Sequence, residues 1–192
     1  MNILGLNFGA TSSCAIFKND EIVFASSEER FSRIKSDESY PYNAIEKGLE
    51  FLDMNPSDLD QILISGNEIP INYILLRFYS SFSIEDHLKS MNEFWKKKLS
   101  GEDHETFLKI FENKANHEVY PFNQLSKKFS NLLNEEHDNY SIENKDKISE
   151  FFKEAIANQL SVDKKIISHI DHHTGHAAYA FYASPIREDN TL

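Results

Sequence analysis

The sequence is poor in cysteine and in basic residues, and each shortage argues against a class of protein. Cys14 is the only cysteine among 192 residues, so no disulfide framework can form and we expect a reducing, cytoplasmic compartment. Lysine and arginine number 20 against 31 aspartates and glutamates, which gives a formal net charge of −11. This charge argues against nucleic acid or an anionic membrane as the main partner.

Long apolar runs and a targeting pattern are also missing. No apolar run is long enough to span a bilayer, and Met1–Gly5 contains no basic segment ahead of an apolar core, as a signal peptide would. Internal repeats are absent too. With 40% hydrophobic and 27% charged residues, the composition indicates a soluble globular protein with one sizeable core, or one domain with a large insertion.

The N-terminal part predicts three strands joined by short loops. Residues 2–8 form an apolar run typical of a buried strand, and Cys14–Phe17 and Ile22–Ser26 follow as two strands around a polar turn. Between the first two lies a loop of small and hydroxyl-bearing residues, Gly9–Ser13. This order resembles the start of an actin-like or ribonuclease-H-like domain, in which the first turn faces a nucleotide or its acyl-phosphate derivative. Because any tight turn favours such residues, the loop alone is weak evidence.

A second group of elements completes the predicted sheet and encloses a long crossover. Ser27–Lys35 is expected to form a solvated loop with local ion pairs, and Pro41–Met54 an amphipathic helix. The apolar runs 61–67 and 166–170 predict strands that pair in parallel. The crossover between them favours a helical insertion rather than a separate domain. Its predicted helices cover 72–79, 84–99, 102–113 and 145–160, with a further candidate at 122–134.

Four of the eight histidines lie within eight residues, where the last predicted strand gives way to an alanine-rich helical pattern. Asp171 is a suitable N-cap for that helix. If the helix starts there, His172 and His176 lie on one face, and His173 points elsewhere. Such a pair can present two nitrogens to one transition metal, although the same spacing also fits capping or packing histidines. The zinc-protease pattern H-E-x-x-H is absent, and two ligands are too few for a closed metal site.

Three segments near the two ends of the chain carry a resemblance to a known family. They are Ile3–Gly9 leading into the small-residue turn, Ser27–Lys35 with Tyr40-Pro41 after it, and Asp171–Ala178 followed by Phe181-Tyr182 and Ser184-Pro185. In this order and at these distances they resemble the N-terminal part of the ATP-dependent O-carbamoyltransferases, the nodulation-protein, cephem and tobramycin tailoring enzymes. The insertion is similar only in kind.

This resemblance implies an α/β fold with an actin-like first lobe, and a specific chemistry. The whole enzyme would make carbamoyl-adenylate from carbamoyl phosphate and ATP, and pass the carbamoyl group to a hydroxyl of a small-molecule acceptor, a natural product or a sugar. His172 and His176 would hold iron or another divalent transition metal, which anchors and polarises the adenylate phosphate. The resemblance also implies a set of residues that bind the carbamoyl-adenylate: Gly9, Thr11, Ser12, Ser13, Arg33 and Lys35.

Two departures from the family pattern concern the transfer step. Family members usually carry His-Asp after the first strand, where this sequence has Ala10-Thr11, and a histidine after the basic run, where it has Ser36. A histidine at the first position is suited to take a proton from the acceptor hydroxyl or to stabilise the leaving phosphate, and alanine does neither. The catalytic residue is therefore unassigned. The alternative is a non-catalytic actin-like binding or partner subunit that has lost transfer chemistry.

The resemblance also sets an expected domain organisation. We expect a core formed by residues 1–67 and 161–192, with the helical insertion at about 68–160. Because family members are several times longer, we expect a truncated chain that lacks the second actin-like lobe and the carbamoyl-adenylate-forming domain. That lobe, or a partner chain supplying it, is then an expected partner, and a homodimer is a further candidate.

Overall fold

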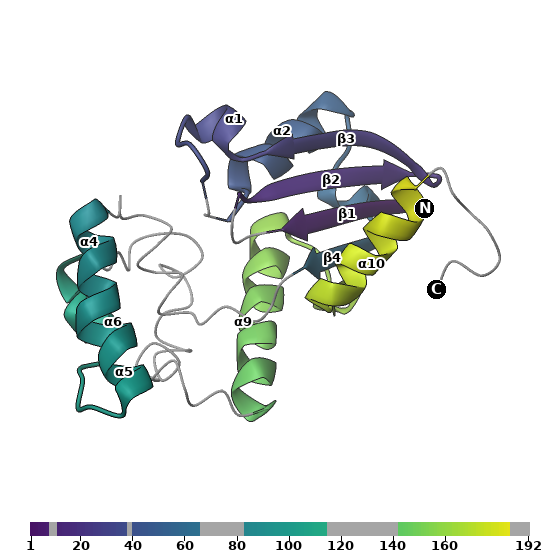
Figure 1. Cartoon of the computed structure of the whole chain (residues 1–192). Helices are drawn as coiled ribbons and strands as arrows, with labels where there is room; N and C mark the ends of the chain where they lie inside the picture. The colour runs from purple at the N-terminus through teal and green to yellow at the C-terminus, as the bar shows by residue number, and fades with distance from the viewer. Residues whose placement is uncertain (8–10, 38–39, 66–82, 115–141, 185–192) are drawn as a thin grey trace.

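The computed structural model has a five-stranded mixed sheet as its central layer (Figure 1). It describes residues 1–7, 11–37, 40–65, 83–114 and 142–184. The strands lie in the order β3-β2-β1-β4-β5, with β2 antiparallel to both β1 and β3, and with β1, β4 and β5 parallel. The predicted hairpin and the predicted parallel pair of strands are confirmed. The strands are β1 (Asn2–Asn7), β2 (Ser13–Lys18), β3 (Glu21–Ser27), β4 (Gln61–Ser65) and β5 (Ile167–Ile170).

One face of the sheet is buried under two helices. Leu4 and Leu6 of β1, and Ile62 and Ile64 of β4, alternate with outward-facing residues and are at most 2% exposed. The helices α2 (Tyr42–Phe51) and α9 (Ile142–Leu160) complete this main core. The α9 helix contributes a group of fully or almost fully buried side chains: Ile148, Phe151, Phe152, Ala155, Ile156 and Leu160.

The segment predicted to be a solvated loop, 27–35, is instead anchored by a buried carboxylate, so that prediction was wrong in part. Glu28 is 2% exposed, and its carboxylate accepts hydrogen bonds from the backbone N–H groups of Asn43 at 3.2 Å and Ala44 at 2.8 Å. These N–H groups belong to the first turn of α2, where no intrahelical acceptor exists. The helical turn α1 (Glu29–Ser32) follows directly. Glu28 therefore fixes the start of α2 from a distant point in the chain.

The end of α2 also differs from the prediction. The helix stops at Phe51 rather than at Met54, because Asp53 adopts a left-handed φ of 50° and the N–H of Met54 turns back to the carbonyl of Leu49 at 3.0 Å. The short 3₁₀ segment η1 (Pro56–Asp58) then leads into β4. A second 3₁₀ segment, η4 (Lys164–Ile166), precedes β5.

The crossover contains a small helical unit. The predicted helix over 84–99 is confirmed, as α4 (Ile84–Lys89), a π-helical segment η2 (Ser90–Trp95) and α5 (Lys96–Ser100). The predicted helix over 102–113 is wrong in its first part. It begins only at Phe107, because Gly101 takes a left-handed φ of 71° and Thr106 caps the next helix through the N–H of Lys109. The remaining pieces are α6 (Phe107–Ile110) and the 3₁₀ segment η3 (Glu112–Lys114).

This helical unit has its own hydrophobic cluster, formed by Phe94, Phe107 and Phe111. Its members are distinct from those of the main core. The helices predicted over 72–79 and 122–134 lie outside the described residues. Among the helices that the structure describes, none is long and apolar enough to cross a membrane.

The last helix, α10 (His172–Ala183), crosses the opposite face of the sheet. Figure 1 draws it in front of the strands, whereas α2 lies behind them. None of its residues is buried. This face of the sheet, with the start of α10 at its edge, carries the candidate site.

Candidate functional site

Asp171 fixes the first turn of α10, which begins directly after β5. Its Oδ1 accepts hydrogen bonds from the backbone N–H of Thr174 at 2.9 Å and from the Thr174 hydroxyl at 3.2 Å, so the predicted N-cap is confirmed. These hydrogen bonds stabilise the carboxylate and hold the pKa of Asp171 below its ordinary value. The cap thereby sets the direction in which the histidines of the first turn emerge.

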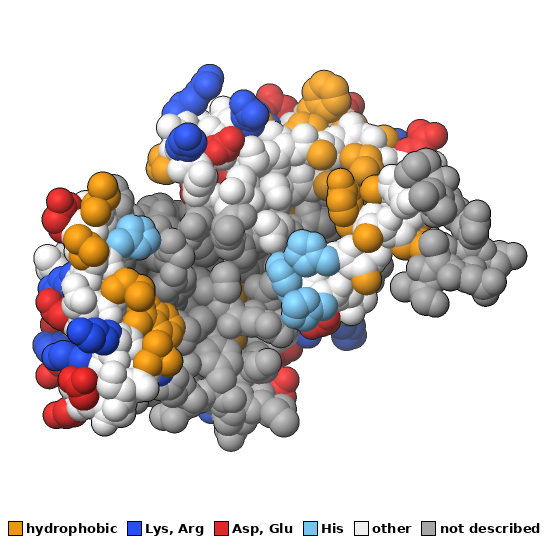
Figure 2. Space-filling view, in the orientation of Figure 1, with side chains coloured by type: hydrophobic (Ala, Val, Ile, Leu, Met, Phe, Trp, Pro, Cys, Tyr) orange, Lys and Arg blue, Asp and Glu red, His pale blue; other side chains and the backbone are white. Residues whose placement is uncertain are grey.

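The rings of His172 and His176 meet one turn apart. Their Nε2 atoms are 3.0 Å apart and their ring centroids 4.5 Å apart, which confirms the predicted placement on one helical face. The ring of His173 lies to one side, with its centroid 5.6 Å from that of His172. Both paired histidines are exposed, and Figure 2 shows the histidines together at the start of α10.

The short separation of the two Nε2 atoms has two chemical explanations. One imidazole donates its Nε2–H to the other, or both nitrogens point lone pairs at one metal ion. Two nitrogens bound at about 2.0–2.1 Å with a right angle between the bonds lie about 2.9 Å apart, close to the observed spacing. The donor set therefore fits a divalent transition metal. Among the described residues no group of three metal-ligating side chains gathers, so further ligands would come from elsewhere.

Next to this pair the sheet ends in a row of polar side chains, one from each of four strands. The strand registers place Ser27 opposite Ser13, Ser13 opposite Asn7, and Asn7 opposite Ser65. Directly paired residues project to the same face of a sheet. Gly175 of α10 lies against this row, since a Cβ on it would sit 3.7 Å from the Ser65 hydroxyl oxygen. The row, defined as Ser27, Ser13, Asn7 and Ser65, thus places three hydroxyls and one carboxamide on the face that α10 crosses, and Ser65 is the member that lies against the helix.

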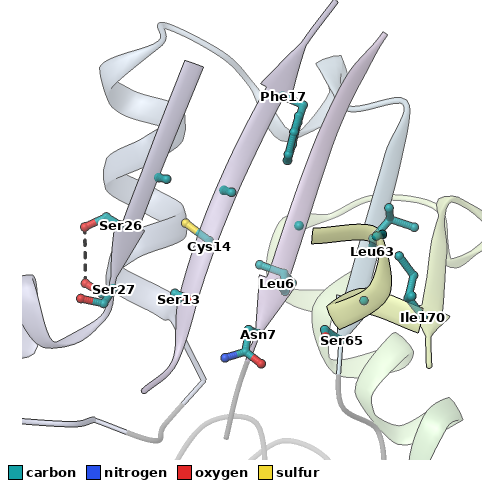
Figure 3. Close-up of a pocket in the computed structure, with 15 residues that line it drawn as sticks. Leu6, Asn7, Ser13, Cys14, Phe17, Ser26, Ser27, Leu63, Ser65 and Ile170 are labelled. Carbon is teal, nitrogen blue, oxygen red and sulfur yellow. Dashed lines mark hydrogen bonds between the residues drawn. The ribbon is translucent and has the colours of Figure 1, made fainter. Parts of the chain in front are cut away.

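A cavity of about 650 Å³ lies on this face of the sheet, next to α10 (Figure 3). It is open because the next row of the sheet has Ala25, Ala15 and Gly5 on β3, β2 and β1, whose small side chains leave space above these strands, and Leu63 of β4 continues the row. Its size suits a small-molecule ligand. The polar row forms part of its wall, and the full lining is Gly5, Leu6, Asn7, Ser13, Cys14, Ala15, Phe17, Ala25, Ser26, Ser27, Leu63, Ser65, Ile170, Gly175 and Ala178.

In the loop predicted to face the carbamoyl-adenylate, the described residues Thr11, Ser12 and Ser13 differ in position, and of these three Ser13 lines the cavity. Thr11 is exposed and has a left-handed φ of 65°. Ser12 is fully buried, where its N–H donates to the Asp37 carbonyl at 2.7 Å and its carbonyl accepts from the Glu28 N–H at 2.9 Å. The Ser12 hydroxyl has no hydrogen-bond partner among the described residues. Ser12 therefore anchors the loop through its backbone, and Ser13 is the member that reaches the cavity.

The remaining predicted ligand-binding residues are not brought into the cavity wall. Arg33 and Lys35 are exposed, and Arg33 ends α1 with a left-handed φ of 63°. Figure 2 shows the basic side chains over α1 apart from the histidines of α10. Gly9 and Ala10 lie outside the described residues. Within the described chain, Ser13 is thus the predicted carbamoyl-adenylate contact that lines the cavity next to α10.

The fourth histidine of the cluster points to the other side of the sheet. His169 is half-buried, with its Nε2 3.4 Å from the carbonyl of Ser149 on α9. Burial lowers its pKa below the ordinary value, which favours the neutral ring. It therefore stands apart from the pair.

The sequence analysis did not predict Asn7, Ser27 and Ser65 as site residues. Each is the last residue of its strand, and the alternation of buried and outward-facing residues along the strand places its side chain on the face away from the main core.

Fold and site together define an α/β protein whose mixed sheet carries a histidine pair on a helix next to a cavity of small-ligand size. The model of the family described as carbamoyltransferase N-terminus matches residues 2–192, and the chain belongs to this family. The resemblance drawn from three segments of the sequence is thereby confirmed. A stretch of 66 residues is also 35% identical to an uncharacterised protein of Methanocaldococcus jannaschii. It covers 33% of this chain and 12% of that protein.

Proposed function

We propose that the chain is the part of an O-carbamoyltransferase that holds the activated carbamoyl group for transfer. The whole enzyme forms carbamoyl-adenylate from carbamoyl phosphate and ATP, and the acceptor is a hydroxyl of a small molecule. In the transfer step the acceptor oxygen bonds to the carbonyl carbon, and the bond from that carbon to the phosphate oxygen breaks. AMP leaves, and the hydroxyl proton passes to a base. Membership of the carbamoyltransferase N-terminus family supports the reaction class.

The observation that carries this proposal is that one helix bears the histidine pair and also borders the cavity. Gly175 and Ala178 of α10 line the cavity together with Asn7, Ser13 and Ser65, and His172 and His176, which are not among the lining residues, flank Gly175 on the same helix. A carboxamide such as that of Asn7 both donates and accepts hydrogen bonds, which complements the NH₂–C=O of a carbamoyl group. The serine hydroxyls can donate to phosphate oxygens. A divalent metal held by the two histidines, iron in our proposal, would supply Lewis-acid polarisation of the phosphate.

We extend the proposal to the surroundings of the site. The strand order, with a β-hairpin flanking three parallel strands, supports an actin-like first lobe. We expected its core at 1–67 and 161–192, but α9 also belongs to it, because six of its side chains between Ile148 and Leu160 are buried in the main core. In this arrangement a second lobe or a partner chain covers the outer side of α10. The exposure of the helix favours this, since none of its residues is buried, and Tyr179 is 74% and Tyr182 is 68% exposed.

Metal binding and transfer are tested together with histidine variants. We expect the chain to bind one equivalent of Fe²⁺, measured by elemental analysis after dialysis, and His172→Ala with His176→Ala to lose it. His173→Ala is the matched control, because it removes a neighbouring exposed imidazole on the same helix but not one of the pair. In the complete enzyme, supplied with ATP, carbamoyl phosphate and a panel of hydroxyl acceptors, the double variant should lose carbamoyl transfer by about 100-fold or more.

Two results would contradict this proposal. Equal metal content in the double variant and in His173→Ala would show that the pair is not the metal site. Undiminished carbamoyl transfer in a double variant that has lost its metal would separate the metal from the reaction. Circular dichroism of each variant checks that α10 is still folded.

A second candidate function follows from Ala10, which replaces the usual family histidine. We propose, as the alternative, a non-catalytic binding or partner subunit that keeps the fold and the metal pair. Ala10→His combined with Thr11→Asp in the complete protein distinguishes the two. Transfer that appears only in this variant favours the alternative, and transfer already present in the natural sequence rejects it.

A further inference from the structure

The longest helix of the crossover unit carries hydrophobic side chains on its outer side. The segments α4, η2 and α5 form one continuous helix over 84–100, because the residues at both joints have right-handed helical dihedral angles. Its inner side is defined by Ser90 and Phe94, which are 6% and 2% exposed. On the outer side, Ile84 and Leu99 are 76% and 82% exposed.

These outer residues form a regular stripe. Ile84, Leu88, Met91, Trp95 and Leu99 follow one another at intervals of four, three, four and four residues, which keeps them on one helical face. Leu88 and Met91 are 57% and 55% exposed, and Trp95 is half-buried. Figure 2 shows the hydrophobic side chains running along this unit. We call these five residues the 84–99 stripe. Such spacing is that of a helix that packs against a second helix.

The charges on the same helix select the orientation of that second helix. Glu85 and Asp86 stand at its start, and Lys96, Lys97 and Lys98 stand at its end. Asp86 already pairs with Lys114, and the Lys98 ammonium lies over the rings of Phe94 and Trp95, so Glu85, Lys96 and Lys97 are the charges that would face a second helix. A parallel copy would place like charges side by side, whereas an antiparallel copy places the acidic start of each helix beside the basic end of the other. Complementary charge fixes orientation in helix pairs even where it adds little affinity.

The spacing of the hydrophobic residues in the stripe is similar in both directions along the helix, as a twofold contact requires. An antiparallel pairing sets Ile84 against Leu99 and Leu88 against Trp95 of the other copy. Met91 then lies beside its own counterpart at the centre. We propose that the helix over 84–100 is a dimerisation element, through which two copies of this chain associate antiparallel about a twofold axis. This surface is separate from the histidine pair, so the proposal does not depend on the proposed reaction.

Sedimentation velocity of the 192-residue chain over a range of concentrations tests the association. We expect a species of twice the chain's 22.2 kDa, and we expect Met91→Lys to leave only the monomer, because two ammonium groups would meet at the axis. Ile34→Lys is the matched control, since Ile34 is 55% exposed, as Met91 is, but lies outside the stripe. A chain that is monomeric throughout, or a dimer that survives Met91→Lys, overturns the proposal.

Charge exchange tests the orientation. Glu85→Lys alone, or Lys96→Glu combined with Lys97→Glu, should each weaken the dimer by about tenfold, because each places like charges across the interface. The combined variant should recover most of the loss. A dimer that is lost in Met91→Lys but fails to recover in the combined charge variant overturns the antiparallel arrangement.

Cysteine cross-linking gives an independent measure of the register. The natural Cys14 is buried, so an introduced thiol is the reactive one. Met91→Cys should form a disulfide-linked dimer on mild oxidation. Ile84→Cys alone should not, but should cross-link when mixed with Leu99→Cys. Efficient self-linking of Ile84→Cys would indicate a parallel pair and contradict the proposal.

Discussion

Cys14 shows how burial alone sets the chemistry of a side chain in this protein. The thiol is 3% exposed, in the strand β2, and burial together with the negative charge of Glu28 raises its pKa to about 12. Both causes disfavour the thiolate. The residue therefore behaves as a small hydrophobic group of the main core, although its backbone borders the cavity. This environment disfavours a nucleophilic role for the thiol at neutral pH.

The pKa of Cys14 predicts a loss of stability at alkaline pH. Between about pH 9 and pH 12 the folded chain keeps the thiol proton that the unfolded chain releases. The free energy of unfolding should therefore fall as pH rises through this window, by up to about 1.4 kcal/mol per pH unit. Urea unfolding at several pH values from 8 to about 10.5 measures the slope. Cys14→Ala is the control, and equal slopes for the two chains would contradict the prediction.

Residue-scale features were the hardest to predict from sequence. Asp171 and the His172–His176 pair could be placed, because a cap and a four-residue spacing are local patterns. Glu28 could not, because its hydrogen bonds reach Asn43 and Ala44, and nothing in a mixed-charge segment marks one carboxylate as buried. The polar row was missed for the same reason, since its members meet only through strand register.

At the scale of elements, the packing of α2 on the sheet depends on Gly48. A Cβ at this position would lie 2.8 Å from the ring of Phe24 and 3.0 Å from Ile16, so α2 can lie this close to β2 and β3 only with glycine. A glycine inside a helix costs about 1 kcal/mol in helix propensity relative to alanine, and the close packing of α2 on the sheet offsets this cost.

Gly48→Ala should therefore destabilise the chain, by up to about 2 kcal/mol, because overpacking costs more than the gain in helix propensity. Gly175→Ala in α10 should have the opposite sign and stabilise by about 0.5–1 kcal/mol, since its new Cβ would meet Ser65 only at 3.7 Å. Urea unfolding of both variants measures whether each substitution lowers or raises the free energy of unfolding. Stabilisation by Gly48→Ala would contradict the steric argument.

Elements with strong hydrophobic periodicity were predicted well, and elements defined by caps were not. The strands and the helices at 84–100 and 142–160 follow long apolar patterns, so their type could be read from the sequence. The C-terminal ends of α2 and α5 depend on single residues in unusual conformations, Asp53 and Gly101, which periodicity does not reveal. The π-helical turn within 84–100 has no sequence signature that we recognise.

At the scale of the whole molecule, the two hydrophobic clusters differ greatly in size. Among the described residues, which exclude 66–82 and 115–141, the main core contains 18 buried residues and the cluster of the crossover unit three. Burial of apolar area dominates folding free energy, so the smaller cluster supports a much smaller local stability. The two units should therefore open separately rather than in one cooperative transition.

Trp95, the only tryptophan of the chain, reports on the smaller unit, because its ring packs against Phe94 at 5.0 Å between centroids. We expect its fluorescence to change at a lower urea concentration than that at which the amide protons of β1 and β4 lose protection from hydrogen exchange. Phe107→Ala removes a buried ring from the cluster, at a cost of about 3–5 kcal/mol, and should abolish protection in 84–110 while leaving β1 and β4 unchanged. Ile62→Ala, in the main core, is the matched control. In this variant the amide protons of β1 and β4 should lose protection at a lower urea concentration than in the natural chain, and the urea concentration at which Trp95 fluorescence changes should stay the same. Coincident transitions in the natural chain, or loss of sheet protection in Phe107→Ala, would mean that the two clusters fold as one cooperative unit.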